Sequence, residues 1–146
     1  MAKMIFVNLP VADVAASTAF YEAIGCVKDT TICKGPEAAM MVWSDTISFM
    51  ILDRAFYQTF TTKQIIDART TSGVLLCLSR DSRADVDAIT EAALAAGGRE
   101  PRPVQDMGFM YGRAFEDLDG HVFEPMWMDV DAAVAAMRGQ SEPVAA

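Results

Sequence analysis

Basic residues are scarce in this sequence: 12 Lys plus Arg stand against 20 Asp plus Glu, and the formal net charge is −8. A protein that binds nucleic acid neutralises phosphates with a cationic face, and anionic membranes attract basic segments. The sequence has no basic run, no apolar run of membrane-spanning length and, after the N-terminal Met-Ala-Lys, no apolar run long enough for a signal peptide. We therefore expect neither nucleic acid nor a membrane as a partner.

Histidine and cysteine are sparse as well. His121 is the only histidine, so a site with two histidine ligands is impossible within one chain and a Ser-His-Asp triad has little scope. Neither a glycine-rich phosphate-binding motif nor a G-x-S-x-G motif occurs. Cys26, Cys33 and Cys77 are odd in number and form no CxxC pair, which is typical of free thiols in a reducing compartment. The sequence thus predicts a cytoplasmic protein.

What the sequence does contain is an internal repeat. The chain has 146 residues, of which 52% are hydrophobic, enough for one domain with a well-filled core. Residues 12–25 (ADVAASTAFYEAIG) and 84–97 (ADVDAITEAALAAG) align without a gap, and half of the aligned positions are identical. Both segments carry apolar residues at helical spacing, so two equivalent helices are predicted.

The ends of both segments carry helix-terminus signals. Asp13 is an expected N-cap, because its carboxylate can accept hydrogen bonds from the free amides of the first turn. Ser82, three residues before an aspartate, resembles the start of a capping box. Gly25 and Gly97 are expected just after the helix ends, since glycine adopts positive φ without steric cost.

Short β-prone segments surround both helices. One precedes each helix, at residues 5–9 and 74–78, and three follow each, at 27–33, 40–43 and 46–52 and at 99–104, 110–116 and 121–128. The predicted fold class is α+β, with two tandem βαβββ units (3–52 and 73–128), a joint (53–72), a C-terminal helix (129–138) and a frayed tail (139–146). Two such units set edge to edge would form a curved eight-stranded sheet around a concave cleft.

The joint is rich in aromatic residues, with Phe56, Tyr57 and Phe60 close together. We favour the interpretation that part of it is a helix packed on the sheet. A lid over the cleft is the alternative.

Four motifs support a resemblance: residues 8–13 (NLPVAD), 17–25 (STAFYEAIG), 108–113 (GFMYGR) and 117–124 (DLDGHVFE). Over almost its whole length the sequence resembles the vicinal oxygen chelate superfamily, which includes glyoxalases, bleomycin-resistance proteins and extradiol dioxygenases. The resemblance implies the paired-unit fold and a homodimer. It does not name the reaction, because one scaffold hosts many chemistries.

Metal-dependent members of this superfamily take ligands from the first and last strands of each unit. Transferred by position, the resemblance places the carboxylate ligand of the second unit at Glu124 and its counterpart at Phe49, which cannot ligate a metal. On the first strand the ligand position falls at Phe6 or Asn8, which share one face, and strand 74–78 offers only Cys77. With Glu124 as the only retained position of three or four, we expect no metal and no cofactor; a divalent metal is the alternative.

Three polar residues each allow a functional and a structural interpretation. Glu124 could act as a general base or bind a cationic ligand, or it could pair with Arg113 or another cation. Arg113 could clamp a ligand carboxylate or phosphate; an ion pair with Glu116, Asp117 or Glu124 is favoured. His121 is expected to be a polar residue near a turn rather than a ligand, and to point to the opposite face from Glu124.

Most aromatic and methionine residues on the strands are expected in the core, with alternate positions lining the cleft. The expected ligand-binding residues are Phe6, Asn8, Phe49, Tyr111, Arg113, Glu124 and Trp127, and Glu124 is the catalytic candidate. The first hypothesis is a glyoxalase/bleomycin-resistance-like protein that binds a small, partly apolar molecule without a metal. The alternatives are a metal-dependent glyoxalase-type lyase or isomerase, or a dioxygenase-like enzyme, in which a partner chain supplies ligands beside Glu124, and a dimeric scaffold without a ligand.

Overall fold

The computed structural model describes residues 1–141, which contain two β-sheets and four helices. The first half of the chain runs β1 (Ile5–Val11), α1 (Val14–Ala23), β2 (Val27–Asp29), β3 (Ala38–Val42), β4 (Ile47–Asp53). After α2 (Arg54–Gln58), the second half runs β5 (Leu75–Ser79), α3 (Arg83–Ala95), β6 (Gln105–Asp106), β7 (Met110–Gly112), β8 (Phe115–Glu116), β9 (Val122–Met128). The last element is α4 (Val130–Ser141).

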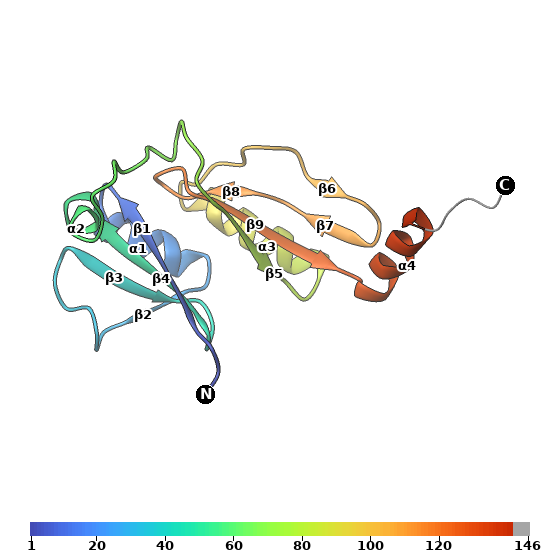
Figure 1. Cartoon of the computed structure of the whole chain (residues 1–146), viewed down its shortest axis with the longest axis horizontal. Helices are drawn as coiled ribbons and strands as arrows, with labels where there is room; N and C mark the ends of the chain where they lie inside the picture. Colours follow the sequence, from blue (N-terminus) through green and yellow to red (C-terminus); the bar gives the residue numbers. More distant parts are fainter. Residues whose placement is uncertain (142–146) are drawn as a thin grey trace.

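The two sheets are mixed and follow the same plan. Their strand orders are β1-β4-β3-β2 and β5-β9-β7-β6, and β8 also pairs with β9. In each sheet the first strand lies parallel to the last, and the other pairs are antiparallel. Figure 1 shows the sheets side by side, with α1 and α3 behind them and the joint crossing between the halves. The α+β class is confirmed.

In the part of the chain that the structure describes, hydrogen bonds do not join the strands into the predicted continuous sheet of eight strands. Across residues 1–141, no strand of the first sheet pairs with a strand of the second. The edge strands β1 and β5 instead leave large apolar side chains exposed: Ile5 is 56% and Leu75 is 53% exposed. A curved surface shared by both sheets remains a prediction.

The predicted helix ends are confirmed. Asp13 caps α1 by accepting a hydrogen bond from the amide of Ala16 at 3.0 Å, and Ser82 caps α3 by accepting from the amide of Asp85 at 3.1 Å. Gly25 and Gly97 follow the helices with φ of 111° and 101°. These local signals act in the same way in both halves, which is why the repeat is visible in the sequence.

The predicted strand at residues 99–104 is wrong. Only Arg99 forms an isolated bridge, with Glu116, and the short strand β6 begins at Gln105. Pro101 and Pro103 explain the shift, because proline has no amide hydrogen to donate to a strand ladder. The predicted strand at 110–116 is split into β7 and β8 where it passes Pro125 of β9, for the same reason.

The joint and the C-terminus also differ in detail. Part of the joint is helical, as predicted, but α2 has only five residues and none of them is buried. Helix α4 continues through residues 139–141, where the sequence predicts a frayed tail. The remaining part of that predicted tail, residues 142–146, lies outside the described residues. None of the helices within residues 1–141 has the length and apolar content that a membrane span requires.

The core joins the two halves through a cluster of aromatic side chains. The rings of Phe49 and Phe123 pack edge to face with centroids 5.2 Å apart, and the Tyr21 ring lies 5.9 Å from each of them. Phe115 stacks on Phe123 at 5.3 Å. All four side chains are at most 1% exposed. Because these residues come from both halves, the halves form one hydrophobic core.

Candidate functional site

Three of the predicted ligand-binding residues lie on the sheet faces that point away from α1 and α3, which we call the open faces. Strand β1 alternates: Val7, Leu9 and Val11 pack into the core, so Phe6 and Asn8 point to the open face of the first sheet. Glu124 has the same position in the second sheet, because its neighbour Phe123 is buried in the core. Phe6 is 48% exposed.

The other four predicted residues lie on the helix side of the sheets. Phe49 is 1% exposed in the core. Tyr111 and Trp127 pair across β7 and β9, and the guanidinium of Arg83 from α3 lies over both rings, 5.0 and 5.4 Å from their centroids. The structure therefore does not bring the seven predicted residues together.

Arg113 also lies on the helix side, where three carboxylates occupy its guanidinium. Its side chain is 9% exposed and forms ion pairs with Asp87 at 3.1 Å, Glu91 at 2.9 Å and Glu100 at 2.9 Å. The hydrogen bond from Tyr111 and the ion pair with Arg113 hold the pKa of Asp87 below its usual range. Arg113 therefore forms ion pairs, as the favoured interpretation predicts. Its partners are not the expected Glu116, Asp117 or Glu124.

Glu124 forms an ion pair with Arg102 on the open face of the second sheet, at 2.5 Å. Cys77 of β5 lies opposite Glu124 in the strand register. Partial burial raises the pKa of the Cys77 thiol, and the Glu124 carboxylate raises it further, so the thiolate nucleophile is disfavoured. Arg102 comes from the loop between α3 and β6, and no local sequence pattern indicates that it reaches this strand.

An apolar space lies between β1 and the joint. We call it the joint hollow; it has a volume of about 300 Å³. Its walls include Asn8, Tyr57, Ile65, Ile66 and Val74. The joint thus lies beside the part of β1 that carries Asn8.

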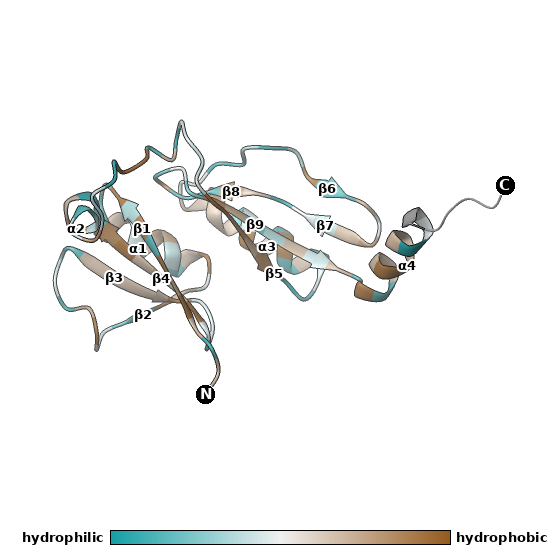
Figure 2. Cartoon of the chain, viewed as in Figure 1, coloured by the Kyte–Doolittle hydropathy of each residue, from teal (hydrophilic) through white to brown (hydrophobic). Residues whose placement is uncertain are grey.

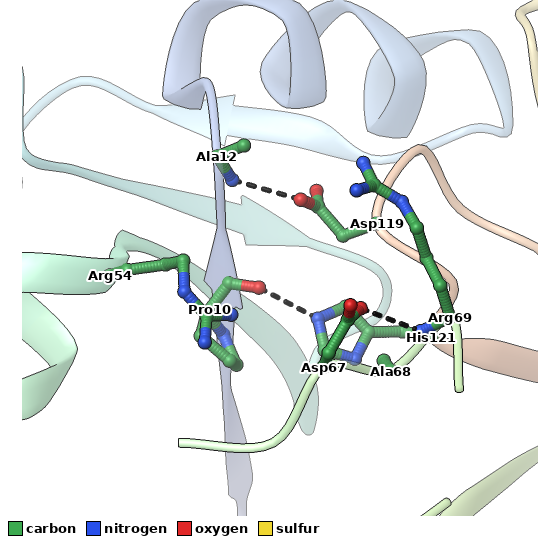
Figure 3. A pocket seen from close by; sticks show the side chains of 8 residues that line it. All are labelled: Pro10, Ala12, Arg54, Asp67, Ala68, Arg69, Asp119 and His121. Atoms are coloured by element: carbon green, nitrogen blue, oxygen red, sulfur yellow. Dashed lines mark hydrogen bonds between the residues drawn. The ribbon is translucent and has the colours of Figure 1, made fainter. Parts of the chain in front are cut away.

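A second space, the polar hollow, has a volume of about 250 Å³ and shares Pro10 and His121 with the joint hollow. Figure 3 shows its charged groups, with Arg54 on one side and Asp67, Arg69 and Asp119 on the other. Arg54 donates to the carbonyls of Ile66 at 3.2 Å and Ile65 at 3.4 Å, which shapes the joint around both hollows. No sequence pattern marks these charged residues as a group, since only the tertiary structure brings them together.

His121 has a structural role between the two hollows. The Nε2 atom lies 2.7 Å from the carbonyl oxygen of Pro10, and the side chain is buried. Nearby, the Asp119 carboxylate accepts a hydrogen bond from the amide of Ala12 at 2.9 Å. Both contacts connect the turn before β9 to the end of β1, as Figure 3 shows. The expectation of a polar histidine near a turn is therefore right, with the addition that it joins the halves.

The turn approaches the joint closely at Gly120. Its φ is 95°, and a Cβ atom at this position would lie 2.8 Å from backbone atoms of Ala68 and Arg69. Only glycine combines this backbone conformation with this separation. Gly120 therefore allows the joint to lie against the second half at the edge of both hollows.

The residues on the open faces do not fit a metal site. Within residues 1–141, no three His, Cys, Asp or Glu side chains lie close enough together to hold an ion. Glu124 is engaged by Arg102, and His121 by Pro10. Phe49 is not the counterpart of Glu124 in the first half of the chain. Phe49 packs against Phe123 in the core, so these two residues correspond to each other. The counterpart of Glu124 is therefore the next residue, Met50. A thioether and an amide do not replace carboxylate ligands for a hard divalent ion.

No protein-family model and no curated protein matches this sequence. Among solved structures, a glyoxalase/bleomycin resistance protein/dioxygenase family enzyme from Burkholderia phytofirmans superposes with a TM-score of 0.69 at 20% identity, over 87% of this chain and 99% of that one. A glyoxalase-related enzyme from Fulvimarina pelagi gives a TM-score of 0.71 at 20% identity, over 87% and 88%. A glyoxylase/bleomycin resistance protein/dioxygenase domain from Frankia gives 0.64 at 22% identity, over 88% and 98%. The resemblance noted in the sequence is thereby confirmed at the level of the fold: the chain has the fold of the glyoxalase/bleomycin resistance protein/dioxygenase structures.

Proposed function

We propose that this protein binds a small, partly apolar molecule in the joint hollow, without a bound metal. The observation that carries the proposal is the hollow itself: its volume of about 300 Å³ is at the lower end of the range for small-ligand sites. Apolar side chains of the joint face the first strand, and the Asn8 amide offers a hydrogen-bonding group. This is the mode of action of the bleomycin-resistance branch of the superfamily, in which binding replaces catalysis.

The polar hollow supports a ligand with a polar or anionic substituent. Arg54 and Arg69 both line it, and it adjoins the joint hollow at Pro10 and His121. A ligand that places its apolar body against Ile65 and Ile66 would therefore direct its polar end toward a charged lining of two guanidinium groups and two carboxylates. We infer that amphipathic molecules bind better than purely apolar ones.

The test uses the dye 8-anilinonaphthalene-1-sulfonate, which joins a flat apolar body to an anionic group. We expect saturable binding and a rise in Tm, because a ligand that binds only the folded state stabilises it. The Ile66→Ser change should weaken dye binding. Ile32→Ser is the matched control: Ile32 is 67% exposed and Ile66 is 41% exposed, but Ile32 lies outside the hollow. Equal effects of the two changes would contradict the proposal.

The second candidate is a metal-dependent lyase or isomerase that uses Glu124 together with ligands from a partner chain. The exposed apolar side chains on β1 and β5 favour it, because a second copy of this chain could cover them and bring more ligands to the open face. Figure 2 shows β5 among the most hydrophobic segments of the chain. A homodimer is part of both candidates and would be measured by light scattering after gel filtration.

Elemental analysis separates the two candidates. Protein purified without chelator should contain no stoichiometric metal if the binding function is right. Stoichiometric metal that is lost in Glu124→Gln and retained in Glu116→Gln would instead establish the enzyme. We further propose the cytoplasm as the location, because Cys26, Cys33 and Cys77 are all free thiols.

A further inference from the structure

A third cavity lies between the halves, at the far ends of β1 and β5 from the joint hollow. We call it the seam cavity; it has a volume of about 500 Å³. Its walls include Ile24, Trp43, Ser44, Ile47, Ser79 and Arg80. The first four come from the end of α1 and the β3–β4 turn, and the last two from the end of β5. No lining residue is shared with the joint hollow or the polar hollow.

Arg80 has fewer partners than the arginines around it. Its guanidinium lies over the Trp43 ring, with the central carbon 5.4 Å from the centroid. Arg83, Arg102 and Arg113 each form an ion pair with a carboxylate, but within residues 1–141 no carboxylate lies within ion-pair distance of Arg80. The Nε atom of Arg80 is buried and has no hydrogen-bond partner. Arg80 lines the seam cavity and has no carboxylate partner within residues 1–141, so its guanidinium is placed to receive an acceptor from outside the chain.

The other walls restrict what that acceptor can belong to. Ile24, Ile47 and the indole of Trp43 offer apolar surface, which favours an organic body over a small hydrated ion. The Ser44 oxygen accepts hydrogen bonds from the amides of Thr46 and Ile47 at 3.3 and 3.2 Å, which leaves its hydroxyl hydrogen available to a ligand. Arginine presents two parallel N–H groups that match a carboxylate, and the Arg80 guanidinium lies over the Trp43 ring.

We propose that the seam cavity binds a small organic carboxylate with a flat apolar body, held at its carboxylate by Arg80 and at its body by Trp43 and Ile47. The site is independent of the joint hollow and of the proposed function. It lies on the helix side of the first sheet, since Ile47 and Trp43 pack against the core cluster. Both halves supply walls, so an occupied cavity would also stabilise their contact.

The experiment uses Trp43 as a reporter and benzoate as the probe. Trp43 and Trp127 are the only tryptophans, so the Trp127→Phe change leaves Trp43 as the sole indole. In this background benzoate should change the fluorescence in a saturable way. Benzamide, which has the same shape without the charge, and inorganic phosphate, which lacks the apolar body, should each bind at least about tenfold more weakly.

Substitutions at Arg80 complete the test. Arg80→Gln should weaken benzoate binding by about tenfold or more, and Arg80→Lys should also weaken it, because lysine keeps the charge but not the planar fork. Arg83→Gln is the matched control: Arg83 also stacks on aromatic rings but is paired with Asp106, and its loss should leave benzoate affinity unchanged. If Arg80→Gln does not fold, the Arg80→Lys variant and the comparison of benzoate with benzamide still test whether Arg80 binds the carboxylate.

Three results would overturn the proposal: absence of saturable binding, benzamide binding as tightly as benzoate, or equal effects at Arg80 and Arg83. Phosphate binding as tightly as benzoate would also overturn it, since the apolar walls would then have no role. Binding of the naphthalene dye in the joint hollow is tested by Ile66→Ser, so each site can fail without the other.

Discussion

The phenol of Tyr21 in α1 donates a 2.6 Å hydrogen bond to the carboxylate of Asp117 in the second half of the chain. Both groups are buried, Tyr21 at 0% and Asp117 at 5% exposure. Asp117 also accepts hydrogen bonds at 2.9 Å from the amides of Asp119 and His121, which shape the turn before β9. The contact therefore connects the first helix, the turn and the polar hollow.

Tyr21→Phe should lower the free energy of unfolding by about 1.5–3 kcal/mol, because Asp117 would lose a hydrogen bond in a place where water cannot replace it. Tyr111→Phe is the matched control: it removes a hydrogen bond of the same length, 2.6 Å, to Asp87. The Asp87 side chain is 47% exposed, so water replaces the phenol and the loss should be at most about 1 kcal/mol. Urea unfolding of both variants measures the difference, and equal losses would show that burial of the pair has no effect.

Asp117 should also give stability a distinctive dependence on pH. Burial raises the pKa of this carboxyl, and the hydrogen bonds it accepts only partly oppose the shift. The folded state therefore binds the proton more tightly than the unfolded state, and the stability that this group contributes is lost as pH rises from the ordinary value near 3.9 through the raised pKa. Unfolding of the wild type and Asp117→Asn should show a difference in slope in this window.

The control for that slope is Asp106, whose carboxylate is paired with Arg83. This pair lowers the pKa of Asp106 to about 2, so its contribution is present above the ordinary carboxyl pKa and is lost as pH falls toward 2. Asp106→Asn should therefore change the slope in the opposite sense and at lower pH. A wild-type curve parallel to that of Asp117→Asn as pH rises above the ordinary carboxyl pKa would contradict the assignment to Asp117.

Phe49 and Phe6 should respond to truncation in different ways. Phe49→Ala removes a ring from the shared aromatic core and should destabilise the fold by roughly 3–5 kcal/mol. Phe6 is 48% exposed on the open face, and Phe6→Ala should change stability by no more than about 0.5 kcal/mol. Thermal unfolding measures both. A large loss for Phe6 would indicate that the open face of β1 is covered, as by a second copy of the chain.

Arg113→Gln should destabilise the protein by roughly 1–3 kcal/mol, because three carboxylates would lose their common cation while its site stays largely buried. Added salt should reduce the loss by screening the repulsion among the carboxylates. Arg83→Gln breaks one pair whose side chains are 40% and 50% exposed, and should cost within about 1 kcal/mol. Urea unfolding at low and high ionic strength checks both, and a salt-independent loss at Arg113 would rule out the electrostatic explanation.

The features that were predictable from the sequence are those set by neighbouring residues. Asp13, Ser82, Gly25 and Gly97 act on their own helix ends, so the helices and the repeat could be read directly. Strand lengths were less predictable, because the effect of Pro125 on the split between β7 and β8 depends on which strand lies opposite.

The faces of the strands were the main source of error in the site. Side chains alternate along a strand, so an alignment that is wrong by one residue moves a side chain to the other face. This happened at Phe49, which was aligned with Glu124 and instead corresponds to Phe123. Tyr111, Arg113 and Trp127 lie on the helix side because α3 carries Arg83 and a row of carboxylates that bind them. No local pattern reveals such partners.

The close approach at Gly120 has a practical consequence. A side chain at this position would clash with the backbone of Ala68 and Arg69, at 2.8 Å from the Cβ, and would push the joint outward. The dimensions of both hollows are thus adjustable from one site that contributes no side chain to the joint hollow, so that ligand size could be retuned by engineering while every residue in contact with the ligand is kept.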